Sequence, residues 1–187
     1  MLQVPLAISV WDDGFGISVP NDLQVTKGSI SEIGRGFAPA KGVPGIDVHV
    51  VRGWDYPALC DTYALAIEKV RRDHAPALIH VTEMTQPQGH STSGSHERYK
   101  TKDRLRYETE MDPIARMREW MIREELATAA ELDEREREDR QYVEGVRADA
   151  WRAYSQPILE DREHVVTLLE RAARESGAEA LSALAQR

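Results

Sequence analysis

The sequence predicts an α/β fold, in which a parallel sheet with flanking helices is followed by a helical carboxyl-terminal region. Residues 77–84 form an apolar run rich in aliphatic and β-branched side chains, which is typical of a buried strand. Residues 56–72 repeat apolar side chains at helical spacing, and the spacing is helical again beyond residue 101. We therefore expect an α/β domain over residues 1–111 and a helical tail over residues 112–187.

Two further strands are expected before the first long helix. Residues 4–10 form a short apolar run that stops at the turn Trp-Asp-Asp-Gly-Phe-Gly of residues 11–16. Residues 17–37 are expected to be mostly loop, with a turn or two of helix capped by a serine. Residues 46–51 alternate enough to form a second strand.

Asp55 is a suitable N-cap for the helix over residues 56–72, which would connect the strand 46–51 to the strand 77–84. Such a strand-helix-strand unit makes its two strands parallel. The turn after Val10 and the loop after Met84 then follow the carboxyl ends of strands, where open α/β sheets bind their ligands.

The helical tail is defined by its capping signals. Thr101 can cap a short helix, Asp112 with Pro113 begins another, and residues 128–131 form a capping box. Nine of the ten residues from 131 to 140 are charged, which indicates a solvated helix face. We expect Pro157 to end this helix, with a final helix or two over residues 164–183.

Composition excludes several classes of function. The net charge is −8 and the isoelectric point is near 5.3, so there is no basic face for nucleic acid or an anionic membrane. No apolar run is long enough to span a bilayer, and the start of the chain does not read as a signal peptide. The single cysteine, Cys60, is expected to be a buried, inert thiol, and the protein is expected to be cytoplasmic.

Residues 86–100 form a polar loop that leaves the strand 77–84, and it contains Gly-His-Ser-Thr-Ser at residues 89–93. Physical reasoning leaves two interpretations open, a solvated connection or a functional loop on a fixed scaffold. The pair Asp12 and Asp13 is equally open. Adjacent carboxylates on a glycine turn suit a hard cation such as Mg²⁺, but they also form ordinary turns.

The loop, with Arg98-Tyr99-Lys100 after it, resembles the phosphorylation loop of the α subunit of thiamine-diphosphate-dependent 2-oxo acid dehydrogenases. These enzymes are the decarboxylating first components of the pyruvate and branched-chain 2-oxo acid dehydrogenase complexes. The resemblance extends in register over residues 4–125, through residues 53–59, 77–80 and 112–114. It implies a partial thiamine-diphosphate-binding fold.

The resemblance also implies roles for individual residues. Asp13 matches an asparagine whose side chain binds Mg²⁺, and Phe15 matches an aromatic residue whose carbonyl binds it, so both would help to hold thiamine diphosphate. His90 matches a loop histidine that approaches the cofactor and assists proton transfer and reductive acylation. Ser91 matches a phosphorylated, regulatory serine. Residues that anchor the loop correspond to Arg98 and Tyr99.

Two functions from different classes follow. In the first, the chain is part of an enzyme that oxidatively decarboxylates a 2-oxo acid and passes the acyl group to a lipoyl carrier. The resemblance implies a β subunit, separate or fused, a lipoyl-bearing acyltransferase and an oligomer. In the second, the chain is a non-catalytic fragment or assembly module that binds a partner chain. Because the family motif begins with Gly-Asp-Gly well upstream, and only eleven residues precede Asp12, the chain alone is expected to be incomplete and inactive.

Two histidines are left out of the site, and Ser91 is not expected to be a nucleophile. His80 lies within a predicted strand and is expected to be a packed or hydrogen-bonded residue. His96 has no cysteine or carboxylate around it in the pattern of a zinc site. Ser91 is not flanked by the Gly-x-Ser-x-Gly elbow of a serine nucleophile.

Overall fold

The computed structural model describes residues 3–90, 95–177 and 179–185. The chain divides into two compact units, Met1–Ala127 and Thr128–Arg187, which are described separately. The expected boundary after residue 111 lies within the first unit and stays a prediction.

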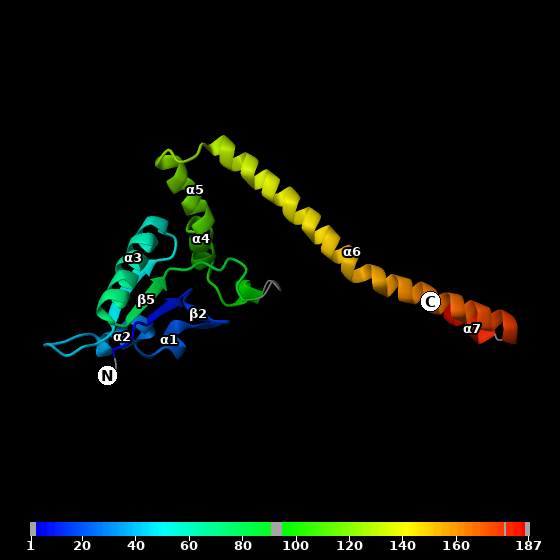
Figure 1. The fold of residues 1–187 in the computed structure, drawn as a ribbon, viewed down its shortest axis with the longest axis horizontal. Helices are drawn as coiled ribbons and strands as arrows, with labels where there is room; N and C mark the ends of the chain where they lie inside the picture. The colour runs from blue at the N-terminus through cyan, green and yellow to red at the C-terminus, as the bar shows by residue number, and fades with distance from the viewer. Residues whose placement is uncertain (1–2, 91–94, 178, 186–187) are drawn as a thin grey trace. The chain divides into compact units, whose positions relative to one another are not determined.

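A three-stranded parallel sheet organises the first unit (Figure 1). Its strands are β1 (Ala7–Trp11), β4 (Asp47–Arg52) and β5 (Ala77–Thr82), in the order β1-β5-β4. Ala7 and Asp47 both pair with Ala77, so the three strands begin at one level. The predicted α/β class and the parallel sheet are confirmed, and β5 is the buried central strand.

Helix α3 (Tyr56–Asp73) covers one face of this sheet (Figure 1). It begins where predicted, because Oδ1 of Asp55 accepts a hydrogen bond of 3.1 Å from the backbone N–H of Ala58. Its inward positions pack on alternate residues of β4 and β5 and form the core of the unit. That core consists of Val51, Ala66, Val70, Ala77, Ile79 and Val81.

The segment between β1 and β4 is more ordered than the sequence predicted. It contains the short strands β2 (Phe15–Gly16) and β3 (Val19–Pro20), and then α1 (Asn21–Gln24), η1 (Thr26–Gly28), α2 (Ile30–Gly34) and η2 (Arg35–Phe37). Helix α2 packs against the sheet face opposite α3. There Gly34 is needed, because a Cβ atom at this position would lie 2.6 Å from the side chain of Leu78.

Beyond the loop come η3 (Ser95–Arg98), α4 (Lys102–Glu110) and α5 (Pro113–Arg123). Both predicted caps are confirmed: Thr101 accepts from the N–H of Arg104, and Asp112 accepts from the first turn of α5. The apolar side chains of α5 are unequally covered: Ile114 is 78% exposed, whereas Met117 and Met121 are half-buried.

The expectation of a buried Cys60 is wrong, because the structure exposes this side chain. Leu59 and Tyr63 lie on the inward face of α3. Cys60 follows Leu59, and successive residues of a helix are rotated by about 100°. The side chain of Cys60 therefore points away from the sheet.

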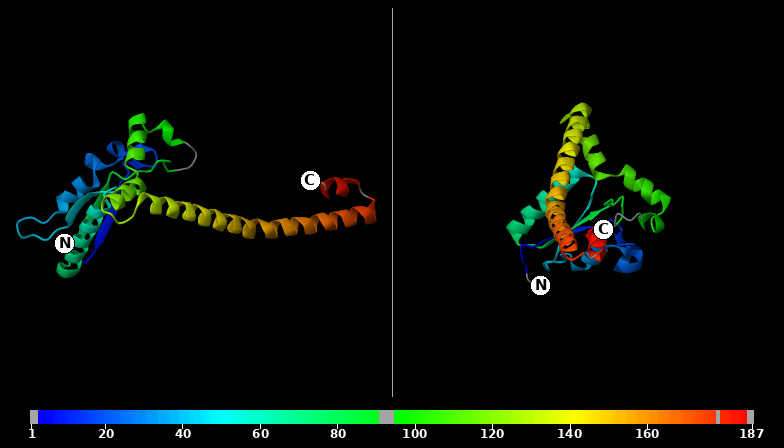
Figure 2. Two further views of the ribbon diagram at one scale, coloured as in Figure 1. Left: turned by 90° about the horizontal axis from the view of Figure 1, so that it is seen from above. Right: turned by 90° about the vertical axis from the view of Figure 1, so that its right-hand side faces the viewer.

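The second unit consists of α6 (Ala129–Ser176) and α7 (Glu179–Ala185), which packs against α6 (Figure 2). The predicted capping box is present between Thr128 and Glu131. The prediction that Pro157 ends this helix is wrong. Proline removes a single backbone hydrogen bond and kinks a helix, and good helix formers on both sides continue it here.

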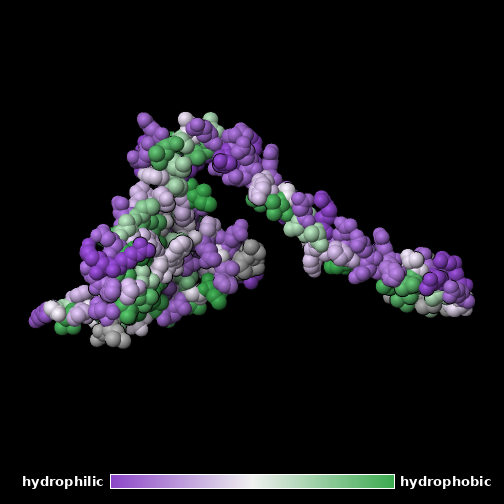
Figure 3. Space-filling model, viewed as in Figure 1, coloured by the Kyte–Doolittle hydropathy of each residue, from purple (hydrophilic) through white to green (hydrophobic). Residues whose placement is uncertain are grey.

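The surface of α6 is mostly hydrophilic, with separate apolar patches (Figure 3). The charged first turns carry exposed pairs such as Arg135 with Glu138 and Arg140 with Glu136, as expected for a solvated face. Within the residues that the structure describes, no helix combines the length and the apolar character that crossing a membrane requires.

Candidate functional site

The turn after β1 is held by the side chain of Asp12. Its Oδ1 accepts hydrogen bonds from the N–H of Gly14 at 2.8 Å and from the side-chain amide of Asn21 at 2.7 Å. Its Oδ2 lies 2.9 Å from Nε2 of His80. Burial alone would raise the pKa of Asp12, but the hydrogen bonds from His80, Gly14 and Asn21 outweigh it and keep the pKa below its ordinary 3.8. Asp12 therefore has both oxygens engaged by protein groups.

Asp13 is arranged differently, in a way that leaves an oxygen available. Its Oδ1 accepts a hydrogen bond of 3.0 Å from the N–H of Phe15, and its backbone carbonyl accepts one of 2.7 Å from Arg104. Among the described residues, no protein donor contacts Oδ2. Gly14, which lies between Asp13 and Phe15, has φ +83°, a conformation that glycine adopts without strain.

The loop that carries His90 begins at the carboxyl end of β5. Gly89 has φ +65° and is buried, whereas His90 is exposed. The regulatory prediction for Ser91 falls on residues 91–94, which lie outside the described part of the chain. Arg98 is exposed at the end of η3.

Tyr99 contacts both halves of the predicted site. Its ring lies 5.6 Å from the ring of Phe15, measured between centroids. Its hydroxyl group lies so close to Gly89 that a Cβ atom there would come within 2.5 Å of it. Tyr99 is therefore placed between the glycine next to His90 and the turn that contains Phe15.

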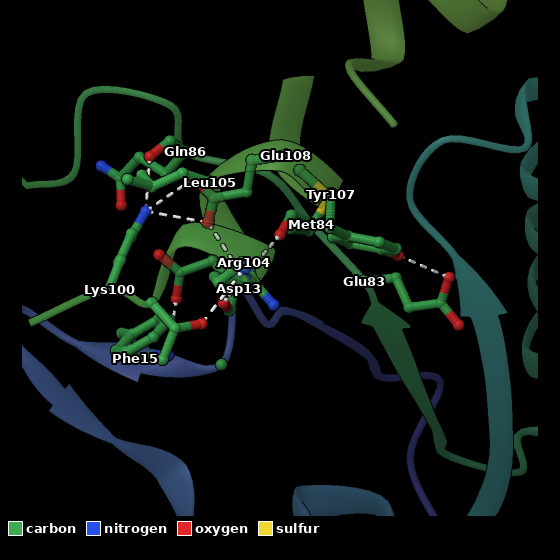
Figure 4. Close-up of polar contacts among 12 residues, drawn as sticks. Asp13, Phe15, Glu83, Met84, Gln86, Lys100, Arg104, Leu105, Tyr107 and Glu108 are labelled. Atoms are coloured by element: carbon green, nitrogen blue, oxygen red, sulfur yellow. Dashed lines mark hydrogen bonds and ion pairs between the residues drawn. The ribbon is translucent and has the colours of Figure 1, made fainter. Parts of the chain in front are cut away.

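Three charged residues, Lys100, Arg104 and Glu108, join the loop to the turn, and we call them the α4 clamp (Figure 4). Nζ of Lys100 donates to both carboxylate oxygens of Glu108 at 2.8 Å and to the backbone carbonyl of Gln86 at 2.7 Å. Arg104 donates to Glu108 through Nε. Through its terminal nitrogen it donates to the carbonyls of Asp13 and Met84, at 2.7 and 3.2 Å.

Two of the three side chains of the α4 clamp are buried. The side chains of Lys100 and Glu108 are each 1% exposed, so water does not screen their attraction. Lys100 and Arg104 also lie over the ring of Phe15, each 5.5 Å from its centroid. The start of the loop, its end and the Asp13 turn are thus fixed to one helix.

Glu83 lies at the start of the loop, and its carboxylate has three polar partners. Its carboxylate accepts hydrogen bonds from Trp54 at 2.8 Å and Tyr107 at 2.9 Å and pairs with Arg52 at 3.1 Å. Its backbone has φ +56°, which is uncommon for a residue other than glycine.

Sequence reasoning missed the α4 clamp, Glu83 and the contact of His80. The spacing of Arg104 and Glu108 by four was a usable signal, since side chains four apart share a helix face, whereas Lys100 precedes the helix. That spacing predicts pairing but not burial.

The residues around the turn suit Mg²⁺-bound thiamine diphosphate in their chemistry. An open hollow of about 250 Å³ lies beside the turn, and its lining includes Trp11, Asp13, Phe15, Asn21 and Gln24. Mg²⁺ prefers carboxylate and carbonyl oxygens, which Asp13 and Phe15 can supply. Among the described residues, no group of three or more His, Cys, Asp or Glu side chains is arranged to hold a metal ion.

Most of the chain matches a known protein family. A family model described as dehydrogenase E1 component matches residues 1–159, which include the sheet, the Asp13 turn, the loop and the α4 clamp. No curated protein sequence matches the chain significantly. Because the family model covers most of its length, this chain belongs to the dehydrogenase E1 component family, the thiamine-diphosphate-dependent E1 components of 2-oxo acid dehydrogenases.

Proposed function

We propose that this chain is the α-type part of a 2-oxo acid dehydrogenase of the pyruvate or branched-chain type. The assembled enzyme oxidatively decarboxylates a 2-oxo acid and transfers the acyl group to a lipoyl carrier. The observation that carries the proposal is the α4 clamp, which fixes the Asp13 turn and the loop bearing His90 to each other. A cofactor anchor and a proton-transfer group need this kind of fixed relation.

In this proposal the turn binds the cofactor and the metal. The carboxylate of Asp13 and the carbonyl of Phe15 would hold Mg²⁺, which would supply positive charge for binding the diphosphate of thiamine diphosphate. When bound, thiamine diphosphate supplies the nucleophilic carbon and the electron sink for decarboxylation. Asp12 does not act as a ligand, since its oxygens are engaged by Gly14, Asn21 and His80.

The loop supplies proton transfer. The exposed imidazole of His90 takes up and releases a proton at a ring nitrogen beside the reacting group, which is the task that imidazole performs in many enzymes. Tyr99 and Arg98 anchor the loop, and the contact of Tyr99 with Gly89 and Phe15 supports that role.

Ser91 regulates the same loop. A phosphoryl group next to His90 would add negative charge close to the diphosphate and disfavour the ordered loop. The matched pair Ser91→Glu and Ser91→Ala tests this: turnover should fall with Ser91→Glu and change less with Ser91→Ala. Equal turnover in both variants would remove Ser91 as a regulatory residue.

E1 components generally work in complexes with other subunits. For this chain we propose a β subunit, separate or fused, as the partner that completes the active site, and a lipoyl-bearing acyltransferase as the acceptor. The assembly is then an oligomer.

The test uses the chain assembled with its β-type subunit, assayed for oxidative decarboxylation of pyruvate and of branched-chain 2-oxo acids. His90→Asn should abolish most of the activity. His74→Asn is the matched control, because His74 is exposed at the left-handed end of α3, where asparagine is tolerated. Asp13→Ala should raise the Mg²⁺ concentration required, and Asp61→Ala on the exposed side of α3 should not.

A second function, a non-catalytic assembly module, is favoured by one observation. The edge strand β1 and the residues before it expose apolar side chains, including Leu6, Ile8 and Trp11. Such an edge suits pairing with another chain. Thiamine diphosphate binding and activity that are the same with and without His90 and Asp13 would favour this alternative.

A further inference from the structure

His80 is a buried imidazole with one polar contact. It lies on the central strand β5, its side chain is 2% exposed, and Nε2 contacts Oδ2 of Asp12. The other ring nitrogen, Nδ1, is buried without a hydrogen-bond partner among the described residues. A buried polar atom without a partner costs stability, and an apolar side chain would fill this position without that cost. Stability of the sheet therefore does not explain the imidazole.

The contact with Asp12 has a geometric effect. An ionised carboxylate only accepts hydrogen bonds, so Nε2 of His80 carries the hydrogen. With Oδ2 engaged from the sheet, Oδ1 is directed to the N–H of Gly14 and to the side chain of Asn21. The backbone N–H of Asn21 donates in turn to the carbonyl of Gly14, at 3.0 Å.

Gly14 lies between Asp13 and Phe15, so whatever fixes Gly14 also fixes the directions of the Asp13 carboxylate and the Phe15 carbonyl. Asp12 thus connects a strand in the protein core to a turn at its surface. Groups that hold ligating residues in place often set affinity as much as the ligands themselves.

We propose that His80 is a positioning residue, which acts through Asp12 to hold the turn in its ligand-binding conformation before Mg²⁺ and diphosphate arrive. The ligand named here rests on the proposed function. The ordering of the turn by His80 does not, because every contact in the argument is within the chain.

The test compares His80→Leu, which keeps the volume but removes the donor, with His80→Gln, whose amide nitrogen can replace Nε2. Amide hydrogen exchange of the full chain is followed at Gly14 and Asn21. Gly53, which donates to Thr82 at the end of the same sheet, is the reference. In His80→Leu we expect exchange about tenfold faster at Gly14 and Asn21 and within about twofold of wild type at Gly53, as for a local opening. His80→Gln should restore slow exchange.

Three results would overturn the proposal. The first is unchanged exchange at Gly14 and Asn21 in His80→Leu. The second is equal acceleration at Gly53, which would show a purely structural role. The third is failure of His80→Leu to fold, which would show that the sheet itself needs the imidazole.

A calorimetric titration of the assembled protein with Mg²⁺ and thiamine diphosphate adds the link to the ligand. His80→Leu should bind about tenfold more weakly, in the range found for residues that orient metal ligands, and His80→Gln should bind like wild type. Unchanged affinity in His80→Leu would contradict the proposal. If the wild-type assembly binds no thiamine diphosphate, the proposed function fails, while amide exchange still decides the role of His80.

Discussion

Replacement of Glu108 by leucine tests the α4 clamp most directly. In the native protein, Glu108 accepts hydrogen bonds from Lys100 through both oxygens and from Arg104 through one. The side chain of Lys100 is 1% exposed and that of Arg104 is 25% exposed. Glu108→Leu therefore leaves an ammonium group buried, with the carbonyl of Gln86 as its remaining hydrogen-bond partner among the described residues.

The size of the effect follows from which charge is left unpaired. Removal of one partner of a buried ion pair costs about 3–5 kcal/mol, which is our expectation for Glu108→Leu. Lys100→Met leaves Glu108 still paired with Arg104, so the loss is closer to that of a charged hydrogen bond, about 1.5–3 kcal/mol. The double variant should recover part of the loss, with a coupling of about 0.5–3 kcal/mol.

Amide exchange of β5 measures the free energy of unfolding of the first unit without a contribution from α6. Glu110→Leu and Arg106→Met are matched controls on the same helix, because these two side chains are 57% and 68% exposed. Each control should change the free energy by about 0.5 kcal/mol or less.

Two results would contradict this account of the α4 clamp. One is that Lys100→Met destabilises the first unit as much as Glu108→Leu does, and the other is that the loss in the double variant equals the sum of the single losses. The first result would mean that Arg104 does not compensate the charge of Glu108, and the second would mean that the buried charges do not depend on each other.

Gly89→Ala should displace the loop and lower decarboxylation, because the new Cβ would lie 2.5 Å from the hydroxyl of Tyr99. The control Gly36→Ala should be neutral, because the space around Gly36 is open. Equal effects of the two variants on decarboxylation would refute the prediction. Burial would raise the pKa of Glu83, but hydrogen bonds, that of Trp54 first, hold it below the ordinary 4.5. The contribution of Glu83 to stability is therefore complete above pH 4.5 and is lost as the pH falls through the lower folded-state pKa. In Glu83→Gln, the free energy of unfolding should depend less on pH in that range. An unchanged dependence on pH would contradict the prediction. Pro157→Ala should stabilise α6 by about 3 kcal/mol, seen as a higher melting temperature by circular dichroism, and no increase would show that the kink costs nothing.

The parts of the fold that sequence reasoning predicted depend on local signals. Asp55, Thr101, Asp112 and Thr128 cap helices because each side chain reaches a backbone N–H two or three residues ahead. The strand β5 was recognisable because both of its faces are buried, which requires a continuous apolar run.

The parts that it missed depend on contacts between distant segments. His80 and Asp12 are 68 residues apart in the chain, and Arg104 and Asp13 are 91 apart. A sequence pattern gives no distance between such residues. Pro157 was misjudged for another reason, because proline disfavours a helix locally while the neighbouring turns can outweigh the cost.

The same principle applies to the candidate site. The glycine turn and the loop could be assigned to one sheet edge, because parallel strands direct their carboxyl ends to the same side. Asn21 and His80 occupy the oxygens of Asp12, and this leaves Asp13 as the aspartate with an available oxygen. Because these contacts exist only in the folded protein, the sequence could not distinguish the two aspartates.

Because Lys100 is buried, its amine is protected from chemical modification. Its nitrogen is held by Gln86 and Glu108 and is shielded from solvent, so acylating reagents should modify the exposed Lys102 two residues later and leave Lys100 intact. Reaction at Lys100 requires the nitrogen to leave both partners, which releases the end of the loop from its beginning. The ratio of labelling at these two lysines is therefore a built-in reporter of loop opening, readable by mass spectrometry in an unaltered protein.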